Sequence, residues 1–177
     1  MCAGTTCSAL SGCNIAPYTQ MIEREARSQN VDPSIVKAIM CRESKGRVNA
    51  VHVNNPPTSV DCGLMQINKP GNTCDQADFD PATNIAKGVA LIKQKYLSIS
   101  QTYQGISKDM MVFAAYNCCG TEGSPNQASR DCTPASGFPF TLPKWACPIN
   151  PGPNATNMCF VRGYVCDITA CSGQLNQ

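Results

Sequence analysis

Two segments decide the fold: DPSIVKAIMCRES at residues 32–44 and DCGLMQIN at residues 61–68. Asp32 can accept hydrogen bonds from the free amides of a helix start, and Pro33 suits the first helical position. Apolar side chains then recur at helical spacing at positions 35, 36, 39 and 40, which predicts a helix with one buried apolar stripe. This helix carries Glu43 on its last turn, where a loop begins.

The position of Glu43 favours a carboxyl group that keeps its proton. The negative end of the helix dipole lies at the last turn, and burial against a core also disfavours the charged form. A protonated carboxyl is what general acid catalysis needs. The cationic neighbours Arg42, Lys45 and Arg47 would act in the opposite sense if they pointed inward, and we expect them to face solvent.

The composition indicates an exported protein stapled by disulfides. The 177 residues include 13 cysteines, a density typical of oxidising compartments, and the odd number leaves at least one thiol unpaired or paired between chains. Metal binding is the weaker interpretation, because the chain has one histidine and no pair of CxxC motifs; we expect no metal and no cofactor. The start shows no basic segment followed by an apolar run, so we expect that a signal segment was removed and that the protein is periplasmic or extracellular.

Charge and hydropathy exclude two classes of partner. The formal net charge of +2 is too small to indicate nucleic-acid binding. No apolar run approaches the length that spans a membrane.

The chain divides into three parts by composition. Residues 1–16 are predicted to form a disulfide-tethered arm, residues 17–120 the core, and residues 121–177 a Cys-, Pro- and Gly-rich extension packed on the same domain. Periodicity predicts helices over residues 17–30, 81–101, 107–117 and 156–171, with a loop or short hairpin over residues 45–62. Gly88 lies inside the second helix, and we expect another backbone to pack closely there.

Four ordered motifs resemble those of the soluble lytic transglycosylases. They are Glu43-Ser44, GLMQIN at residues 63–68, Asn84-Ile85 with Gly88, and AYN at residues 115–117. FDPATNI at residues 79–85 adds to a likeness to the small transglycosylases attached to secretion and conjugation machines. The layout also resembles goose-type lysozyme, and residues 59–68 are similar to a segment of c-type lysozyme. Residues 1–16 and 120–177 lie outside the resemblance.

The resemblance implies a mainly α, lysozyme-like α+β fold in which a helical lobe and a short loop or hairpin line a glycan groove. The implied substrate is the β-1,4 bond between N-acetylmuramic acid and N-acetylglucosamine in peptidoglycan, and secretion or conjugation machinery is an implied partner. Glu43 would protonate the leaving oxygen. The other roles are support of the acid by Ser44, groove lining by Met65 and Gln66, a hydrogen bond from Tyr116 to Glu43, and stabilisation of the helix end by Asn117.

Asp61 leaves the chemistry open between two reactions. In c-type lysozyme a carboxylate at this motif position is the nucleophile or charge stabiliser, which would make the chain a hydrolytic muramidase. A lytic transglycosylase needs no second carboxylate, because the substrate's acetamido and 6-hydroxyl groups replace nucleophile and water. A chitin-type substrate and an inactive glycan-binding or secretion-scaffold protein are the remaining hypotheses.

Two features depart from the family pattern. Cys118-Cys119 follows AYN, and we expect each of these cysteines to pair elsewhere, since adjacent cysteines rarely bridge each other. His52 stands where a small polar residue is common, and it is a candidate substrate contact.

Overall fold

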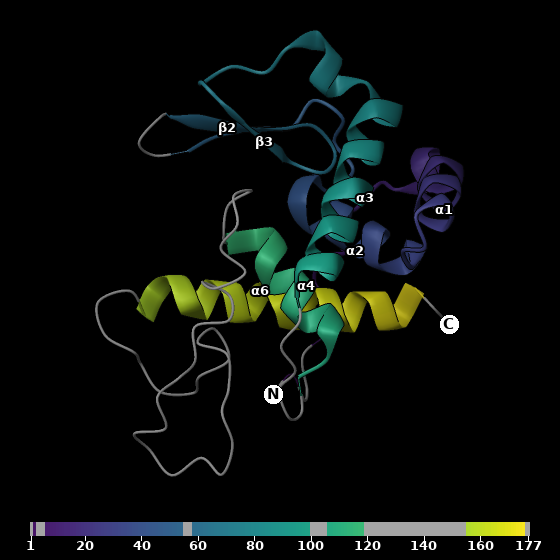
Figure 1. The fold of residues 1–177 in the computed structure, drawn as a ribbon, viewed down its shortest axis with the longest axis vertical. Coiled ribbons are helices and arrows are strands. Elements are labelled where there is room, and N and C mark those ends of the chain that lie inside the picture. The colour runs from purple at the N-terminus through teal and green to yellow at the C-terminus, as the bar shows by residue number, and fades with distance from the viewer. Residues whose placement is uncertain (1, 3–5, 55–57, 100–105, 119–154, 176–177) are drawn as a thin grey trace.

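The computed structural model describes residues 2, 6–54, 58–99, 106–118 and 155–175, with the backbone alone for residues 118 and 155–163. Within these ranges the protein is mainly helical, with one small sheet (Figure 1). The helices are η1 (Ala16–Tyr18), α1 (Thr19–Ser28), α2 (Pro33–Ser44), η2 (Gln76–Phe79), α3 (Pro81–Ser98), α4 (Lys108–Cys118) and α6 (Ala155–Leu175). The strands β1 (Val51–Val53), β2 (Ser59–Cys62) and β3 (Ile67–Pro70) form an antiparallel sheet in that order. The predicted α+β lysozyme-like fold class is confirmed.

Helix α2 is the centre of the core. Its start is as predicted, because the Asp32 carboxylate accepts a hydrogen bond from Ser34 N at 2.8 Å and Pro33 occupies the first turn. Burial extends beyond the predicted stripe to Ala38 and Cys41, both without exposed surface. The stripe was too narrow because α2 packs against α1 and also against α6, so apolar contacts surround most of the helix.

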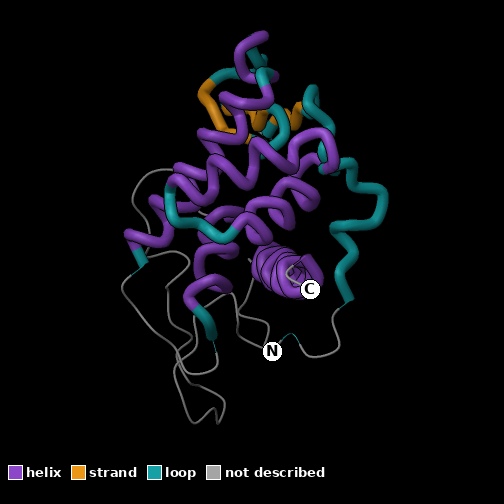
Figure 2. Tube along the Cα trace, turned by 90° about the vertical axis from the view of Figure 1, so that its right-hand side faces the viewer, coloured by secondary structure: helices purple, strands orange, loops and turns teal. Residues whose placement is uncertain are grey.

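The sheet lies at one end of the molecule and α6 crosses the other (Figure 1). In the view of Figure 2, α6 is seen along its axis, and the strands gather at the opposite end of the helices. Helix α3 runs between the two ends, and its start is capped by Asp80, which accepts from Thr83 N at 2.8 Å. The last turn of α3 ends at Ser98, three residues before the predicted Gln101.

Gly88 permits a close approach, although not by a backbone as predicted. A Cβ atom at this position would lie 2.6 Å from Cγ of Met65 and 2.7 Å from its Cβ. The side chain of Met65 therefore fills the space beside α3, and it is fully buried there.

Four disulfides confirm the predicted stapling. They are Cys2–Cys166, Cys7–Cys171, Cys13–Cys41 and Cys62–Cys74. The first two attach the N-terminal arm to α6, whose residues Tyr164, Val165 and Ile168 belong to the same buried core as α2. The side chains of Cys118 and Cys119, each predicted to pair with another cysteine, lie outside the part of the structure that is described. Among the described residues, no helix is long and apolar enough to cross a membrane.

Candidate active site

A cleft of about 740 Å³ lies between the sheet and helices α3 and α4. It is polar, and Glu43 reaches it from the last turn of α2. The sheet side contributes Arg47, Ala50, Val51, His52, Asn54, Ser59, Asp61, Gln66 and Asn68, and the helices contribute Leu91, Lys95, Ala115, Tyr116 and Asn117.

Glu43 is held by a tyrosine from a distant part of the chain. The hydroxyl of Tyr164 on α6 donates a hydrogen bond to Glu43 Oε1, with 2.5 Å between the oxygens. The Tyr164 ring is 3% exposed, and the guanidinium of Arg42 lies over it at 5.7 Å from the ring centroid. One carboxyl oxygen of Glu43 is thus fixed from the core side, which orients the group along the cleft wall.

Burial raises the pKa of Glu43 from its ordinary value of 4.5 to about 7. The hydrogen bond from Tyr164 acts in the opposite direction, because a donor stabilises the charged form. The negative charge of Asp61 raises the pKa of Glu43 further, and the positive charge of Arg42 lowers it. The balance leaves a carboxyl group that exchanges its proton near neutral pH, as general acid and base catalysis require.

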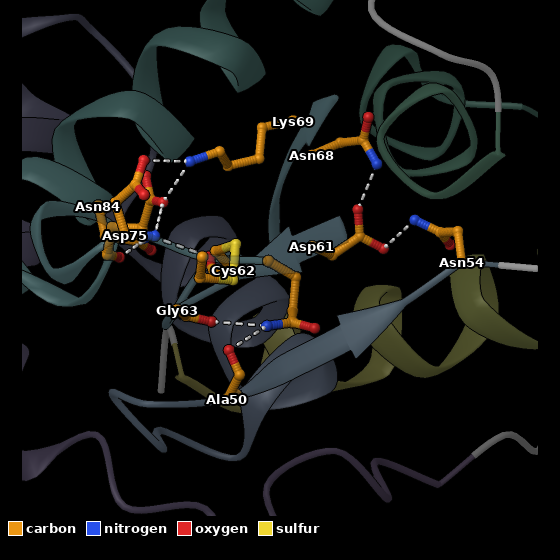
Figure 3. The surroundings of a disulfide bond; sticks show 12 residues. Ala50, Asn54, Asp61, Cys62, Gly63, Asn68, Lys69, Asp75 and Asn84 are labelled. Carbon is orange, nitrogen blue, oxygen red and sulfur yellow. Dashed lines mark hydrogen bonds and ion pairs between the residues drawn. A yellow bond between two sulfur atoms is a disulfide. The ribbon is translucent and has the colours of Figure 1, made fainter. Parts of the chain in front are cut away.

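Asp61 lines the same cleft on β2 and is fixed from two sides. Its Oδ1 accepts from Asn68 Nδ2 at 2.6 Å, and its Oδ2 accepts from Asn54 Nδ2 at 3.3 Å. Figure 3 shows the carboxylate between these two side chains. Asn68 lies directly across the β2–β3 ladder from Asp61, so the antiparallel register places the amide beside the carboxylate.

The GLMQIN segment is a tight turn locked onto α3 by one buried asparagine. Asn84, 1% exposed, donates from Nδ2 to Cys62 O and Asp78 O at 3.0 and 2.9 Å, and its Oδ1 accepts from Met65 N at 2.8 Å. Gly63 adopts a φ of +76°, and a Cβ atom there would lie 2.4 Å from Asn84 Nδ2. Asn84 can therefore occupy its position only because residue 63 is a glycine, which links the two motifs.

A sequence profile of the transglycosylase SLT domain matches residues 20–131, which cover this cleft and its motifs. The chain belongs to this family. Among curated proteins it is similar to "X polypeptide" of Escherichia coli strain K12, with 31% identity over 111 residues that cover 58% of this chain and 61% of the relative. A second Escherichia coli "X polypeptide" is 30% identical over 124 residues, which cover 66% of this chain and 68% of that protein.

Membership of the SLT family supports peptidoglycan cleavage of the lytic transglycosylase type. The chain spans about three fifths of the length of the first of these relatives. The disulfides are consistent with export, because they persist in oxidising compartments.

Three of the residues predicted for the site make contacts that differ from those expected: Tyr116, Met65 and Ser44. Tyr116 donates its hydroxyl hydrogen bond to Met65 O at 2.8 Å, so the tyrosine bonded to Glu43 is Tyr164 and that prediction is corrected. The Met65 side chain is fully buried against Gly88 and does not line the cleft. Its backbone, rather than its thioether, links the turn to α3 and α4.

Ser44 also differs from its predicted role. Its side chain is fully buried, its hydroxyl donates to Met40 O at 3.2 Å, and the same oxygen accepts from Gly46 N at 3.1 Å. The Ser44 hydroxyl therefore stabilises the end of α2, where Lys45 takes the left-handed conformation with φ of 58°, and does not support the Glu43 carboxyl. The backbone oxygen of Ser44 accepts from Nε of Arg47 at 3.1 Å.

The remaining predicted residues do line the cleft. Gln66 donates from Nε2 to Gly63 O and Ala50 O at 2.9 and 3.2 Å, which fixes its amide at the cleft wall. His52, exposed on β1, and Asn117, exposed on the last turn of α4, both contribute to the lining.

The neighbours expected to face solvent do so only in part. Arg47 is exposed and lines the cleft. Arg42 lies over Tyr164, and Lys45 donates from Nζ to Ala9 O at 2.9 Å. Arg47 also donates from Nε to Ser44 O at 3.1 Å, so all three cations contact other parts of the protein, while Arg42 and Arg47 remain exposed.

Proposed function

We propose that this protein cleaves the β-1,4 bond between N-acetylmuramic acid and N-acetylglucosamine in peptidoglycan, with Glu43 as general acid and then general base. The observation that carries the proposal is the Glu43 carboxyl, with a pKa raised to about 7, in the wall of a cleft of about 740 Å³. A cleft of this size accommodates sugar rings, and an acid with such a pKa is protonated in a large fraction of molecules at neutral pH.

In the first step, Glu43 gives its proton to the glycosidic oxygen as the bond from that oxygen to C1 of N-acetylmuramic acid breaks. The oxygen of the substrate's own acetamido group forms a bond to C1 and replaces a protein nucleophile. In the second step, the Glu43 carboxylate takes the proton of the 6-hydroxyl, O6 bonds to C1, and the acetamido oxygen leaves. The product has a 1,6-anhydro end and Glu43 is protonated again, so the cycle closes without water.

Hydrolysis is the second candidate, because Asp61 lies in the same cleft as Glu43 and two asparagine amides hold its carboxylate in place. In that reaction Asp61 would stabilise positive charge on C1 or bond to it, and water would complete the reaction. The product would then carry a reducing end in place of the anhydro ring.

Mass spectrometry of the products distinguishes the two reactions. Purified peptidoglycan is digested with the wild type, Glu43→Gln and Asp61→Asn, and the fragments are weighed. Transglycosylation gives fragments one water lighter than hydrolysis, and Asp61→Asn should still form them. Reducing ends from the wild type, lost in Asp61→Asn, would establish the muramidase instead.

A binding assay with the same strands tests the remaining hypothesis of an inactive glycan-binding or scaffold protein. Glu43→Gln is nearly isosteric, so an enzyme should lose lysis while the variant still binds the glycan. Glu23→Gln on α1 is the matched control, since it makes the same chemical change outside the cleft lining. If the wild type binds strands but releases no fragments at any pH, the enzymatic proposal is wrong.

The place of action is part of the same proposal. An exported enzyme meets peptidoglycan outside the cytoplasm, and the four disulfides fit that environment. Secretion or conjugation machinery would supply a reason for local wall cleavage, and copurification with such a complex from cells would test this partner.

A further inference from the structure

The N-terminal arm, here residues 6–14 together with Cys2, lies outside the residues that match the SLT family and outside the cleft lining. Three disulfides nevertheless connect it to the two helices that form the acid site. Two of them reach α6, which carries Tyr164, and the third reaches α2, which carries Glu43. The arm is thus a covalent bridge between the candidate acid and its hydrogen-bond partner.

Polar contacts follow the same path as the disulfides. Asp167 of α6 is 6% exposed, and its Oδ1 accepts from Ser8 N at 2.7 Å and from Ala9 N at 3.1 Å. Its Oδ2 accepts from the Ser8 hydroxyl at 3.0 Å. From the other side, Nζ of Lys45 donates to Ser8 O and Ala9 O at 3.2 and 2.9 Å. One residue from each helix therefore binds the same two residues of the arm.

These contacts lie one helical turn or less from the acid and its partner. Lys45 follows Glu43 by two residues as the cap that ends α2, and Asp167 follows Tyr164 by three residues, about one turn along α6. Asp167 Oδ2 also lies 3.8 Å from Nε of Arg42, whose guanidinium covers the Tyr164 ring. A displacement of α6 along α2 would therefore move the phenol away from the carboxyl.

We propose that this arm is a positioning clamp for the acid, in which Cys7–Cys171, Cys13–Cys41 and Asp167 hold α6 so that Tyr164 stays bonded to Glu43. The proposal rests on the role of Glu43 given above. A hydrogen bond weakens steeply once its atoms separate by more than a few tenths of an ångström. Packing alone tolerates small sliding between helices, whereas disulfides and hydrogen bonds from both helices to the same arm restrict it.

The clamp predicts that its loss lowers the pKa of Glu43, which a general loss of stability does not do. If α6 moves away, water reaches the carboxyl and the largest cause of its raised pKa, burial, is reduced. The other charged or titratable groups around Glu43 are on elements other than α6. They are Arg42 on α2, Asp61 on β2 and Tyr116 on α4, with Arg47, His52 and Lys95 further along the cleft.

The test is a carbon-13 NMR titration of the Glu43 carboxyl in the full chain, assigned by comparison with Glu43→Gln. In the double variant Cys7→Ala/Cys171→Ala, the midpoint should fall by about one unit, a tenfold change in the ratio of protonated to ionised carboxyl. Asp167→Asn keeps every disulfide and should shift the midpoint in the same direction by less. It keeps the proposal testable if the cysteine variant does not fold.

The control is Ile22→Ala on α1, which shortens a fully buried side chain and lowers stability while it keeps every disulfide and the hydrogen bonds of Asp167. Its Glu43 midpoint should equal that of the wild type. If both clamp variants also titrate like the wild type, the arm stabilises the fold only and the clamp is refuted. A rise of the midpoint in the clamp variants would also refute the clamp, because the carboxyl would then not have gained the water that a displaced α6 admits.

This measurement needs no turnover, so it separates the clamp from the proposed function. If the wild-type protein cuts no peptidoglycan but the titration midpoint of Glu43 falls in the clamp variants, the clamp is supported and the enzymatic role is refuted. If lysis occurs and the midpoint does not move in either variant, the enzymatic role stands and the clamp fails.

Discussion

Replacement of Glu43 by glutamine should stabilise the protein at alkaline pH while it abolishes activity. The folded protein holds the Glu43 proton more tightly than the unfolded chain does, because the pKa rises from 4.5 to about 7 on folding. The contribution of Glu43 to stability is therefore fully present below about pH 4.5 and is lost as the pH rises through about 7. Glutamine has the same shape and no charge, so it does not lose this contribution.

The magnitude follows from the pKa difference. A rise of about 2.5 units, at about 1.4 kcal/mol per unit, corresponds to about 3 kcal/mol. The free energy of unfolding of Glu43→Gln, measured relative to the wild type, should therefore increase by about 3 kcal/mol between pH 4.5 and about 8.5. Burial is the largest cause of the shift, so the effect reports how dry the carboxyl is.

The assay is urea denaturation of both proteins, followed by circular dichroism, at about five pH values across this range with the disulfides intact. Glu23→Gln is the matched control. Lys37 lowers the pKa of Glu23, so the contribution of Glu23 to the free energy of unfolding is complete at every pH above the ordinary pKa range of a glutamate. The difference for that control should stay constant from about pH 6 upward. A constant difference for Glu43→Gln as well would show that the carboxyl ionises without cost, and the argument for a buried acid would fail.

Three further substitutions test single contacts. Tyr164→Phe should raise the pKa of Glu43 above about 7 and lower kcat about 10- to 100-fold, read from the pH profile of peptidoglycan lysis, because it removes a donor that favours the ionised form and fixes the carboxyl. Gly88→Ala should cost about 1–3 kcal/mol in urea denaturation, since the new Cβ would lie 2.6 Å from Met65 Cγ; unchanged stability would mean that Met65 moves aside freely. Asn84→Ala leaves two buried backbone groups and one partly buried group without their partner and should cost at least about 3 kcal/mol, measured by thermal unfolding.

Local signals in the sequence were sufficient for the starts of the helices and for the position of the acid, although they missed strand β3 (Ile67–Pro70). The caps at Asp32, Asp80 and Ser107 are contacts between residues two or three positions apart, so residue type and spacing determine them. The same holds for Glu43, whose place on the last turn of α2 follows from the length of the apolar repeat. These features depend little on the rest of the chain.

Contacts between motifs were predicted less well, because a motif gives the residue types and not the pairing of their atoms. Tyr116 was expected to bond Glu43 and Met65 to line the groove. Tyr116 does line the cleft, but its hydroxyl donates to the Met65 carbonyl. Either arrangement satisfies a buried phenol, and only the depth of the turn relative to α4 decides between them. That depth is set by Asn84 and by the space at Gly88, which are tertiary features.

Tyr164 shows where sequence reasoning reaches its limit in this protein. A helix was predicted over residues 156–171, which include Tyr164. However, 121 residues separate Tyr164 from Glu43, and the local pattern does not indicate which helix Tyr164 contacts. The pairing of α6 with the arm could not be read from the cysteine spacing either, because 13 cysteines allow many combinations. The acid is therefore encoded locally, whereas the group that orients it depends on disulfides between the two ends of the chain. A variant that keeps all four family motifs and loses Cys7 or Cys171 should therefore retain the cleft but no longer hold the Tyr164 hydroxyl against the Glu43 carboxyl.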